Sequence, residues 1–140
     1  MTGRVMAFGT FDVLHLGHLK FFEAARRLGS ELVVVVARDW IVEKVKGRKP
    51  FFSEGERLEL VSALKPVDKA VLGCEGNKYE VIKRFKPDVV VLGYDQKDDA
   101  RVLRAKLDEM GLKKTRVVRL KPFATGKHKS SRVKEFLRKC

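Results

Sequence analysis

The chain alternates short apolar runs with segments of helical periodicity. Runs such as VVVV and VVVL are apolar at every position, which is typical of strands inside a parallel sheet that helices cover on both faces. Apolar runs of this kind predict five strands, at Arg4–Phe8, Glu31–Ala37, Lys69–Leu72, Asp88–Leu92 and Arg116–Leu120.

Helical spacing of apolar residues fills most of the intervals between these runs. It predicts helices at Leu16–Leu28, Ser53–Leu64, Lys78–Phe85, Asp98–Met110 and Ser130–Lys139. Ser53 and Glu56 have the spacing of a capping box, and Gly29 ends the first helix. The segment Arg38–Phe52 shows neither pattern clearly, and its KGRKP run predicts a mobile basic loop.

Strands and helices in this order predict an α/β fold. We expect a single Rossmann-like, doubly wound sheet of five parallel strands flanked by helices, with right-handed crossovers. The length of 140 residues fits one domain over residues 1–140. Ligands of such sheets bind beyond the carboxyl ends of the strands, at the point where the strand order reverses, so functional residues are expected there.

Composition excludes several classes of protein. A hydrophobic content of 44% is too high for a disordered chain. The longest apolar run, Leu32–Ala37, is far shorter than the roughly 20 residues that cross a bilayer, so no membrane contact is expected. The N-terminus runs straight into a predicted strand, which argues against a signal peptide. Two cysteines, Cys74 and Cys140, make no disulfide framework, and we expect a reducing cytoplasm.

The positive charge is concentrated at the C-terminal end. The formal net charge is +13, and residues 111–140 hold 11 basic side chains against 1 acidic, which is +10 of that total. An excess of this size indicates anionic partners. A nucleic-acid-binding module is one reading, but the basic segment has only Phe123 and Phe136 for base stacking and carries no nucleic-acid-binding motif. Small anionic substrates fit better.

The first predicted strand leads into GTFDVLHLGH at residues 9–18, followed by a helix. A Gly-Thr turn before a helix start offers free backbone N–H groups to phosphate. The three-residue spacing of His15 and His18 puts both imidazoles on one helix face, and Gly17 allows close approach to the backbone. From the residues alone, the pair has three possible roles: none, metal ligation without an evident third ligand, or hydrogen-bond donation to phosphate oxygens.

GTFDVLHLGH resembles the opening of the HxGH nucleotidyltransferases, a cytidylyltransferase-like superfamily, and the resemblance extends over the whole chain. SEGERLELV, PVDKAVLG (66–73) and KPDVVVLGYDQ (86–96) are similar to the glycerol-3-phosphate cytidylyltransferase branch. VARD (36–39), KGRKP (46–50), ALKPVDKAVLG and LGYDQ together resemble the archaeal FAD synthases, which are FMN adenylyltransferases.

This resemblance implies a reaction. The phosphate of FMN would attack the α-phosphate of ATP in line and expel pyrophosphate, with Mg²⁺ or another divalent metal and with no metal ligand assigned to the protein. A phosphate monoester is largely ionised near neutral pH, so the protein needs only to position two anions and neutralise charge. Glycerol-3-phosphate cytidylyltransferase, or another HxGH nucleotidyltransferase, is the alternative. The related cytidylyltransferases also imply a homodimer.

The resemblance also implies roles for residues. His15, His18 and Lys49 would be catalytic. Together with the two histidines, the ATP-binding residues would be Gly9, Thr10, Phe11, Leu16, Gly17, Asp95, Phe123, Ser130 and Ser131. Acceptor binding would involve Asp12, Trp40 and Arg57.

Several of these residues have structural alternatives. The serines of HKSSRV (128–133) could simply cap a helix, and Asp95 could do the same. Arg57 could pair with a carboxylate within the fold. Lys49 could be an ordinary solvated lysine, and Phe123 could be a packing residue. Asp12 could orient its loop instead of shaping the acceptor site.

Overall fold

The computed structural model describes residues 3–75, 77–93, 99–121 and 130–139. All five strands run parallel in one sheet of order β3-β2-β1-β4-β5. The strands are β1 (Arg4–Gly9), β2 (Glu31–Val36), β3 (Lys69–Leu72), β4 (Val89–Leu92) and β5 (Arg116–Arg119). The prediction of one α/β sheet of five parallel strands is confirmed.

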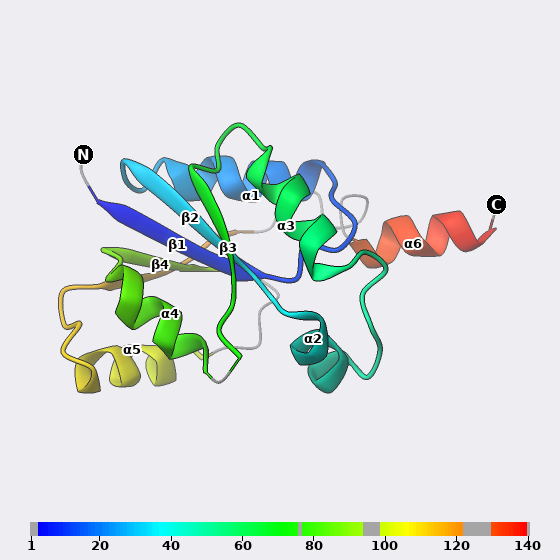
Figure 1. Ribbon diagram of the computed structural model, residues 1–140. Coiled ribbons are helices and arrows are strands. Elements are labelled where there is room, and N and C mark those ends of the chain that lie inside the picture. Colours follow the sequence, from blue (N-terminus) through cyan, green and yellow to red (C-terminus); the bar gives the residue numbers. More distant parts are fainter. Residues whose placement is uncertain (1–2, 76, 94–98, 122–129, 140) are drawn as a thin grey trace.

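Helices cover both faces of this sheet. They are α1 (Leu16–Arg26), α2 (Asp39–Lys46), α3 (Glu54–Ser62), α4 (Lys78–Phe85), α5 (Ala100–Glu109) and α6 (Ser130–Lys139). Helices α1 and α3 lie on one face and α4 and α5 on the other, whereas α6 projects away from the body beyond the carboxyl ends of the strands (Figure 1). Among the described residues, no helix is both long enough and apolar enough to span a bilayer.

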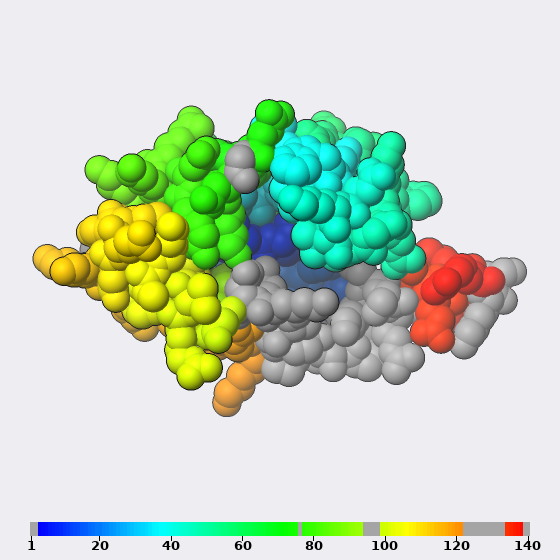
Figure 2. All heavy atoms as spheres, turned by 90° about the horizontal axis from the view of Figure 1, so that it is seen from below, coloured from blue at the N-terminus to red at the C-terminus, as the bar shows by residue number. Residues whose placement is uncertain are grey.

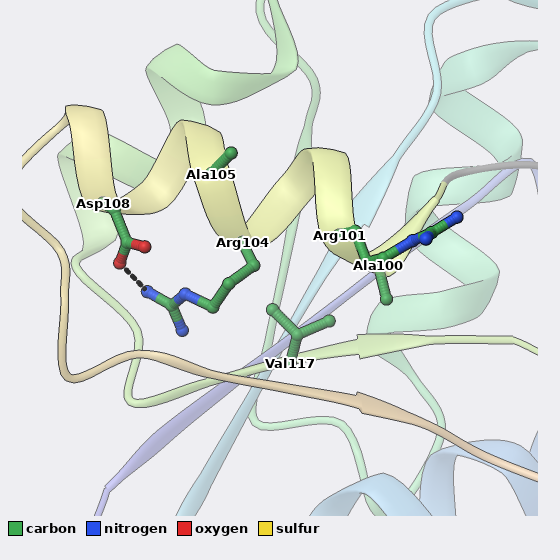
Figure 3. Close-up of a pocket in the computed structure, with 6 residues that line it drawn as sticks. All are labelled: Ala100, Arg101, Arg104, Ala105, Asp108 and Val117. Atoms are coloured by element: carbon green, nitrogen blue, oxygen red, sulfur yellow. Dashed lines mark hydrogen bonds and ion pairs between the residues drawn. The ribbon is translucent and has the colours of Figure 1, made fainter.

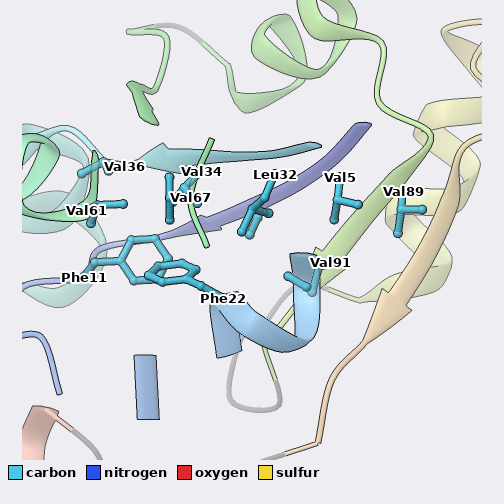
Figure 4. Packing of buried hydrophobic residues seen from close by; sticks show 12 residues of the cluster. Val5, Phe11, Phe22, Leu32, Val34, Val36, Val61, Val67, Val89 and Val91 are labelled. Atoms are coloured by element: carbon cyan, nitrogen blue, oxygen red, sulfur yellow. The ribbon is translucent and has the colours of Figure 1, made fainter. Parts of the chain in front are cut away.

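Side chains from each central strand alternate between two apolar layers. On the α1 and α3 side, Phe22 and Val61 pack against strand residues that include Val5, Leu32 and Val34 (Figure 4). The intervening residues point to the opposite face, where α4 and α5 cover them; this layer contains Met6, Val33, Val35, Val81, Ile82, Val90, Leu92, Leu103 and Leu107. The alternation explains why β2 and β4 are apolar at nearly every position.

The segment Arg38–Phe52 differs from its prediction. Residues 39–46 form helix α2, so the prediction of a loop is wrong for this part. The helix is only 8 residues long, buries only Val42 and overlaps the basic KGRKP run. Gly47 ends it in the left-handed conformation, with φ 78° and its N–H bonded to the Glu43 carbonyl. A glycine directly after a helix is the one signal that could have revealed α2.

Two helix starts show how local sequence sets the boundaries. Ser53 and Glu56 form the predicted capping box: the Glu56 amide donates to Ser53 Oγ at 3.2 Å, and the Ser53 amide donates to Glu56 Oε1 at 3.3 Å. Asp99 caps α5 by accepting from the Arg101 amide at 2.8 Å, so this helix begins two residues later than predicted.

The strand order determines where in the fold a ligand site is expected. From β1 the chain continues through β2 to β3 on one side, and β4 and β5 lie on the other side of β1. The connections that follow β1 and β4 therefore diverge, which opens a crevice at their carboxyl ends. The loop after β1 carries GTFDVLHLGH into this crevice.

Candidate active site

The two histidines stand at the start of α1. His15 is the N-cap residue, and its Nδ1 accepts from the Gly17 amide at 3.0 Å. His18 lies one turn later, and its Nδ1 accepts from the His15 amide at 3.2 Å. A neutral imidazole has one acceptor and one donor nitrogen, so in both rings Nε2 carries the proton when the ring is neutral. The ring centroids are 4.0 Å apart, and the pair offers two adjacent N–H donors.

The electrostatics keep His18 uncharged. Burial, together with the positive charges of His15 and Lys46, lowers the pKa of His18 to about 4. At neutral pH His18 is therefore a hydrogen-bond donor without a net charge. The last residue of α2, Lys46, is near enough to His18 for its charge to contribute to this lowered pKa. Sequence analysis selected Lys49 from the same KGRKP run and missed Lys46, because it did not predict the helix that positions it.

The Phe11 ring packs against the His18 ring. Its side chain is only 8% exposed and belongs to the core, with its ring 4.9 Å from the Phe22 ring and edge-on to the His18 ring at 5.7 Å. The backbone of Phe11 has φ 52°. A Cβ atom added to Gly9 would lie 2.5 Å from Phe11 Cζ, so the glycine leaves room for this ring. The Phe11 side chain is thus not available to the triphosphate, and any contact would come from its backbone.

Arg57 is completely buried and ties three segments together. Its Nη1 donates to the Thr10 carbonyl at 2.8 Å, its Nε to the Phe52 carbonyl at 3.0 Å, and its Nη2 to Asp39 Oδ1 at 2.7 Å. The guanidinium thereby joins the loop after β1 to the start of α2 and to the segment before α3. With 0% exposure, Arg57 cannot contact an acceptor directly, and the alternative of a carboxylate pair within the fold describes it.

Asp12 has a similar organising position. Its carboxylate is 6% exposed and accepts from the Phe51 amide at 2.7 Å, the Phe52 amide at 2.9 Å and Lys134 Nζ at 2.6 Å. Burial alone would raise the pKa of Asp12, but the bonds from Lys134 and the two amides outweigh it and hold the pKa below its ordinary value. An ionised Asp12 therefore orients the surrounding loops, which is the second role that the sequence left open.

The remaining predicted residues have varied positions. Leu16 is partly exposed beside His15, Trp40 is exposed on α2, and Lys49 is exposed in the segment after it. Gly17 is in the first turn of α1, and Ser130 and Ser131 are the first residues of α6. Asp95 and Phe123 lie outside the described residues.

A surface hollow lies between α2 and α4, and atoms from the N-terminal part of the chain, in dark blue, are visible at its floor (Figure 2). A separate pocket lies between α5 and β5, on the face opposite α1 (Figure 3). The guanidinium of Arg104, which lines this pocket, donates to Asp108 and to the carbonyls of Leu112 and Thr115. It therefore stabilises the connection between α5 and β5. The histidine pair does not line this pocket.

No metal centre is evident beside the histidines. Among the described residues, no group of three or more His, Cys, Asp or Glu side chains could hold a metal ion. The two Nδ1 atoms are already bonded to amides, and both rings are arranged as donors. This geometry suits anion binding by Nε2–H groups better than metal ligation.

Comparison with known proteins gives the family. The family model for cytidylyltransferase-like proteins matches residues 6–136. The FAD synthase of Thermoplasma acidophilum is 46% identical over 132 residues, which cover 94% of this chain and 92% of the relative. The FAD synthase of Aciduliprofundum boonei is 50% identical over 120 residues, covering 86% and 79%.

A solved structure agrees with these matches. A Thermoplasma volcanium protein described as a lipopolysaccharide core biosynthesis protein superposes with a TM-score of 0.81 at 46% identity, covering 86% of this chain and 97% of that one. Its fold and the sequence matches over most of the chain lead to one assignment. The chain belongs to the cytidylyltransferase-like family of nucleotidyltransferases and, within it, to the group of the archaeal FAD synthases.

Proposed function

We propose that this protein transfers AMP from ATP to FMN, giving FAD and pyrophosphate. The observation that carries the proposal is the pair of adjacent Nε2–H donors at the start of α1, at the crevice where the strand order reverses. Two such donors suit the charge that develops on phosphate oxygens during nucleotidyl transfer. The choice of FMN and ATP as substrates is supported by the relatives that are FAD synthases.

The reaction needs no covalent enzyme intermediate. An oxygen of the FMN phosphate forms a bond to the α-phosphorus of ATP, while the bond from that phosphorus to the bridging oxygen of the β-phosphate breaks. Pyrophosphate leaves with the electron pair. Because the attacking phosphate is already ionised near pH 7, no general base is required. The protein has to hold two anions in line and neutralise the developing charge.

The described residues divide this work. His15 and His18 donate through Nε2 to phosphate oxygens, and a neutral His18 does so without giving up its proton. Lys46 and Lys49 supply positive charge from α2 and the segment after it, and Gly17 lies in the first turn of α1, where the positive end of the helix dipole favours phosphate.

Further contacts are proposed from the resemblance. Asp95, Phe123, Ser130 and Ser131 would bind the nucleotide. Trp40 would lie on the acceptor side. Asp12 and Arg57 act in this proposal by positioning the loops, in place of the direct acceptor contacts expected from the sequence.

Mg²⁺ enters the proposal as part of the ATP complex. The carboxylate of Asp12, in the loop after β1, already accepts three hydrogen bonds. The described residues contain no group of three or more His, Cys, Asp or Glu side chains that could hold a metal ion. Mg²⁺ is commonly held by substrate phosphates and water with few protein ligands, which fits this site. The metal would neutralise phosphate charge when ATP is bound.

Assembly and location are two further parts of the proposal. A homodimer is supported by the likeness to cytidylyltransferases, and light scattering of the purified protein tests it. A cytoplasmic location is supported by the two cysteines and the absence of a disulfide framework. Fractionation of cells that express the protein tests the location.

A substrate matrix tests the reaction itself. ATP and CTP are each combined with FMN, glycerol 3-phosphate and phosphopantetheine in the presence of Mg²⁺, and pyrophosphate release is measured alongside the chromatographic identity of the product. We expect turnover with ATP and FMN and formation of FAD. Turnover confined to CTP and glycerol 3-phosphate would replace the proposed substrates with those of the alternative branch. Tight, salt-resistant binding of nucleic acid with no transfer reaction would favour the nucleic-acid-binding alternative.

A further inference from the structure

Helix α6 has an unusual attachment. It projects from the body instead of lying on the sheet (Figure 1). From this helix Lys134 reaches the loop after β1 and donates to Asp12 Oδ2 at 2.6 Å. The two residues are 122 positions apart in the chain. The contact thus joins the last helix to the loop that begins the active site.

The same carboxylate also holds the segment before α3. Asp12 Oδ2 accepts from the Phe51 amide as well as from Lys134, and Oδ1 accepts from the Phe52 amide. One nearly buried anion therefore connects three segments that the proposed reaction uses: the loop with the histidines, the basic segment with Lys49, and α6. Lys134 follows Ser130, the first residue of α6, by about one helical turn.

Charge explains why Lys134 matters to this junction. Hydrogen bonds between an ammonium and a carboxylate are shorter and stronger than neutral ones, and the pair is partly shielded from water, with Lys134 31% exposed. Without Lys134 the carboxylate would keep its negative charge at a nearly buried position with two amides as its remaining described partners. Such a carboxylate gains from turning toward water, and that movement would loosen its hold on Phe51 and Phe52.

We propose that Lys134 is a positioning residue, whose ammonium on Asp12 locks the histidine loop, the segment before α3 and helix α6 into one arrangement. The structural part of this inference is independent of the substrate. Its kinetic consequence rests on the proposed function, because it supposes that α6 helps to bind ATP.

The structural part is tested without any substrate. Amide hydrogen exchange of Phe51 and Phe52 is followed by NMR in the wild type and in Lys134→Met, Lys134→Arg and Arg138→Met. Arg138 is exposed on the same helix and also loses one positive charge, so it is the matched control. We expect exchange of both amides about tenfold faster in Lys134→Met, near wild type in Arg138→Met, and largely restored in Lys134→Arg. Unchanged exchange in Lys134→Met, or equal acceleration in Arg138→Met, overturns the proposal.

The kinetic part uses the same variants. We expect Lys134→Met to raise the KM for ATP about tenfold, with a smaller effect on kcat and on the KM for FMN, and Lys134→Arg to recover most of the loss. A fall in kcat alone, with KM for ATP unchanged, contradicts a role in holding α6 for ATP. If the wild type does not adenylylate FMN but exchange at Phe51 and Phe52 responds as expected, the proposed function fails and the lock at Asp12 stands.

Discussion

The starts of α1 and α6 carry the same predicted task but are supported in different ways. Helix α1 follows the central strand of the sheet, and its buried Phe22 and Ala25 fix it to the core. Its His18 ring rests on the Phe11 ring. Helix α6 stands outside the layers, and an ion pair between Lys134 and Asp12 ties it to the loop after β1.

The difference concerns what holds each of the two proposed phosphate-binding segments in place. Apolar packing in a dense core is insensitive to salt and keeps the histidine donors in place before any nucleotide arrives. A partly exposed ion pair weakens as ionic strength rises and is lost when its carboxylate is protonated. We therefore expect α1 to act as a preorganised element and α6 to depend on the state of Asp12.

The largest expected effect comes from removing the donors of α1. His15→Ala and His18→Ala should each lower kcat by about 10²- to 10³-fold, because each removes one N–H group aimed at developing phosphate charge. Pyrophosphate release at saturating ATP and FMN measures the loss. Arg138→Met, on the exposed part of α6, is the control and should retain its rate. Near-normal turnover in both histidine variants would contradict the role of α1.

A substitution of Arg57 tests how much its hydrogen bonds to the loop before α1 contribute to stability. Arg57→Met should lower the free energy of unfolding by about 2–3 kcal/mol, since it leaves Asp39 and the carbonyls of Thr10 and Phe52 without their buried donor. Urea unfolding at pH 7 gives the change. Arg101→Met, at a side chain that is 94% exposed, is the matched control and should unfold like the wild type. Equal midpoints for the two variants would show that the Arg57 network adds nothing to stability.

The pH dependence of stability isolates His18. Its pKa is about 4 in the folded protein and near 6.5 in the unfolded chain, so between these values the unfolded state binds a proton that the folded state does not. Stability should therefore fall by about 2 kcal/mol as pH drops from 7 to 4.5. Urea unfolding at several pH values measures the slope. His18→Gln should remove most of it, and an unchanged slope in that variant would assign the effect to other groups.

The smallest effect is expected from Lys46. Its charge lowers the pKa of His18 less than burial does, so Lys46→Met should move that pKa a small way back toward its ordinary value. NMR titration of the His18 ring follows this change. As an exposed cation near the proposed phosphates, Lys46 should also contribute about two- to fivefold to the KM for ATP. Lys44→Met, two residues earlier on α2 and also exposed, is the comparison. A pKa of His18 that falls in Lys46→Met would refute the interpretation.

Local patterns made much of the fold predictable. Apolar runs marked all five strands, and helical spacing marked every helix except α2. The capping box at Ser53 follows from two residues three apart, and the position of the histidines at a strand-to-helix turn follows from adjacent segments. Helix α2 was missed because it is only 8 residues long, buries one side chain and overlaps the basic KGRKP run, which is typical of a loop.

The sequence could not predict the partners of polar side chains that lie far apart along the chain. Arg57 bonds to Thr10, 47 positions away, and Asp12 bonds to Phe51 and Lys134, 39 and 122 positions away. Such pairs depend on how loops from different crossovers meet, and periodicity carries no information about that. For the same reason, the sequence left open whether Asp12 and Arg57 touch a substrate or hold the loops.

The contact between Gly9 and Phe11 has a consequence for substitutions at these positions. Since a methyl group on Gly9 would strike the Phe11 ring, a larger residue at position 9 requires this ring to move or a smaller residue at position 11. A smaller residue at 11 would also open the space beneath His18. A substitution at position 9 is thus coupled, through the Phe11 ring, to the packing of the His18 imidazole.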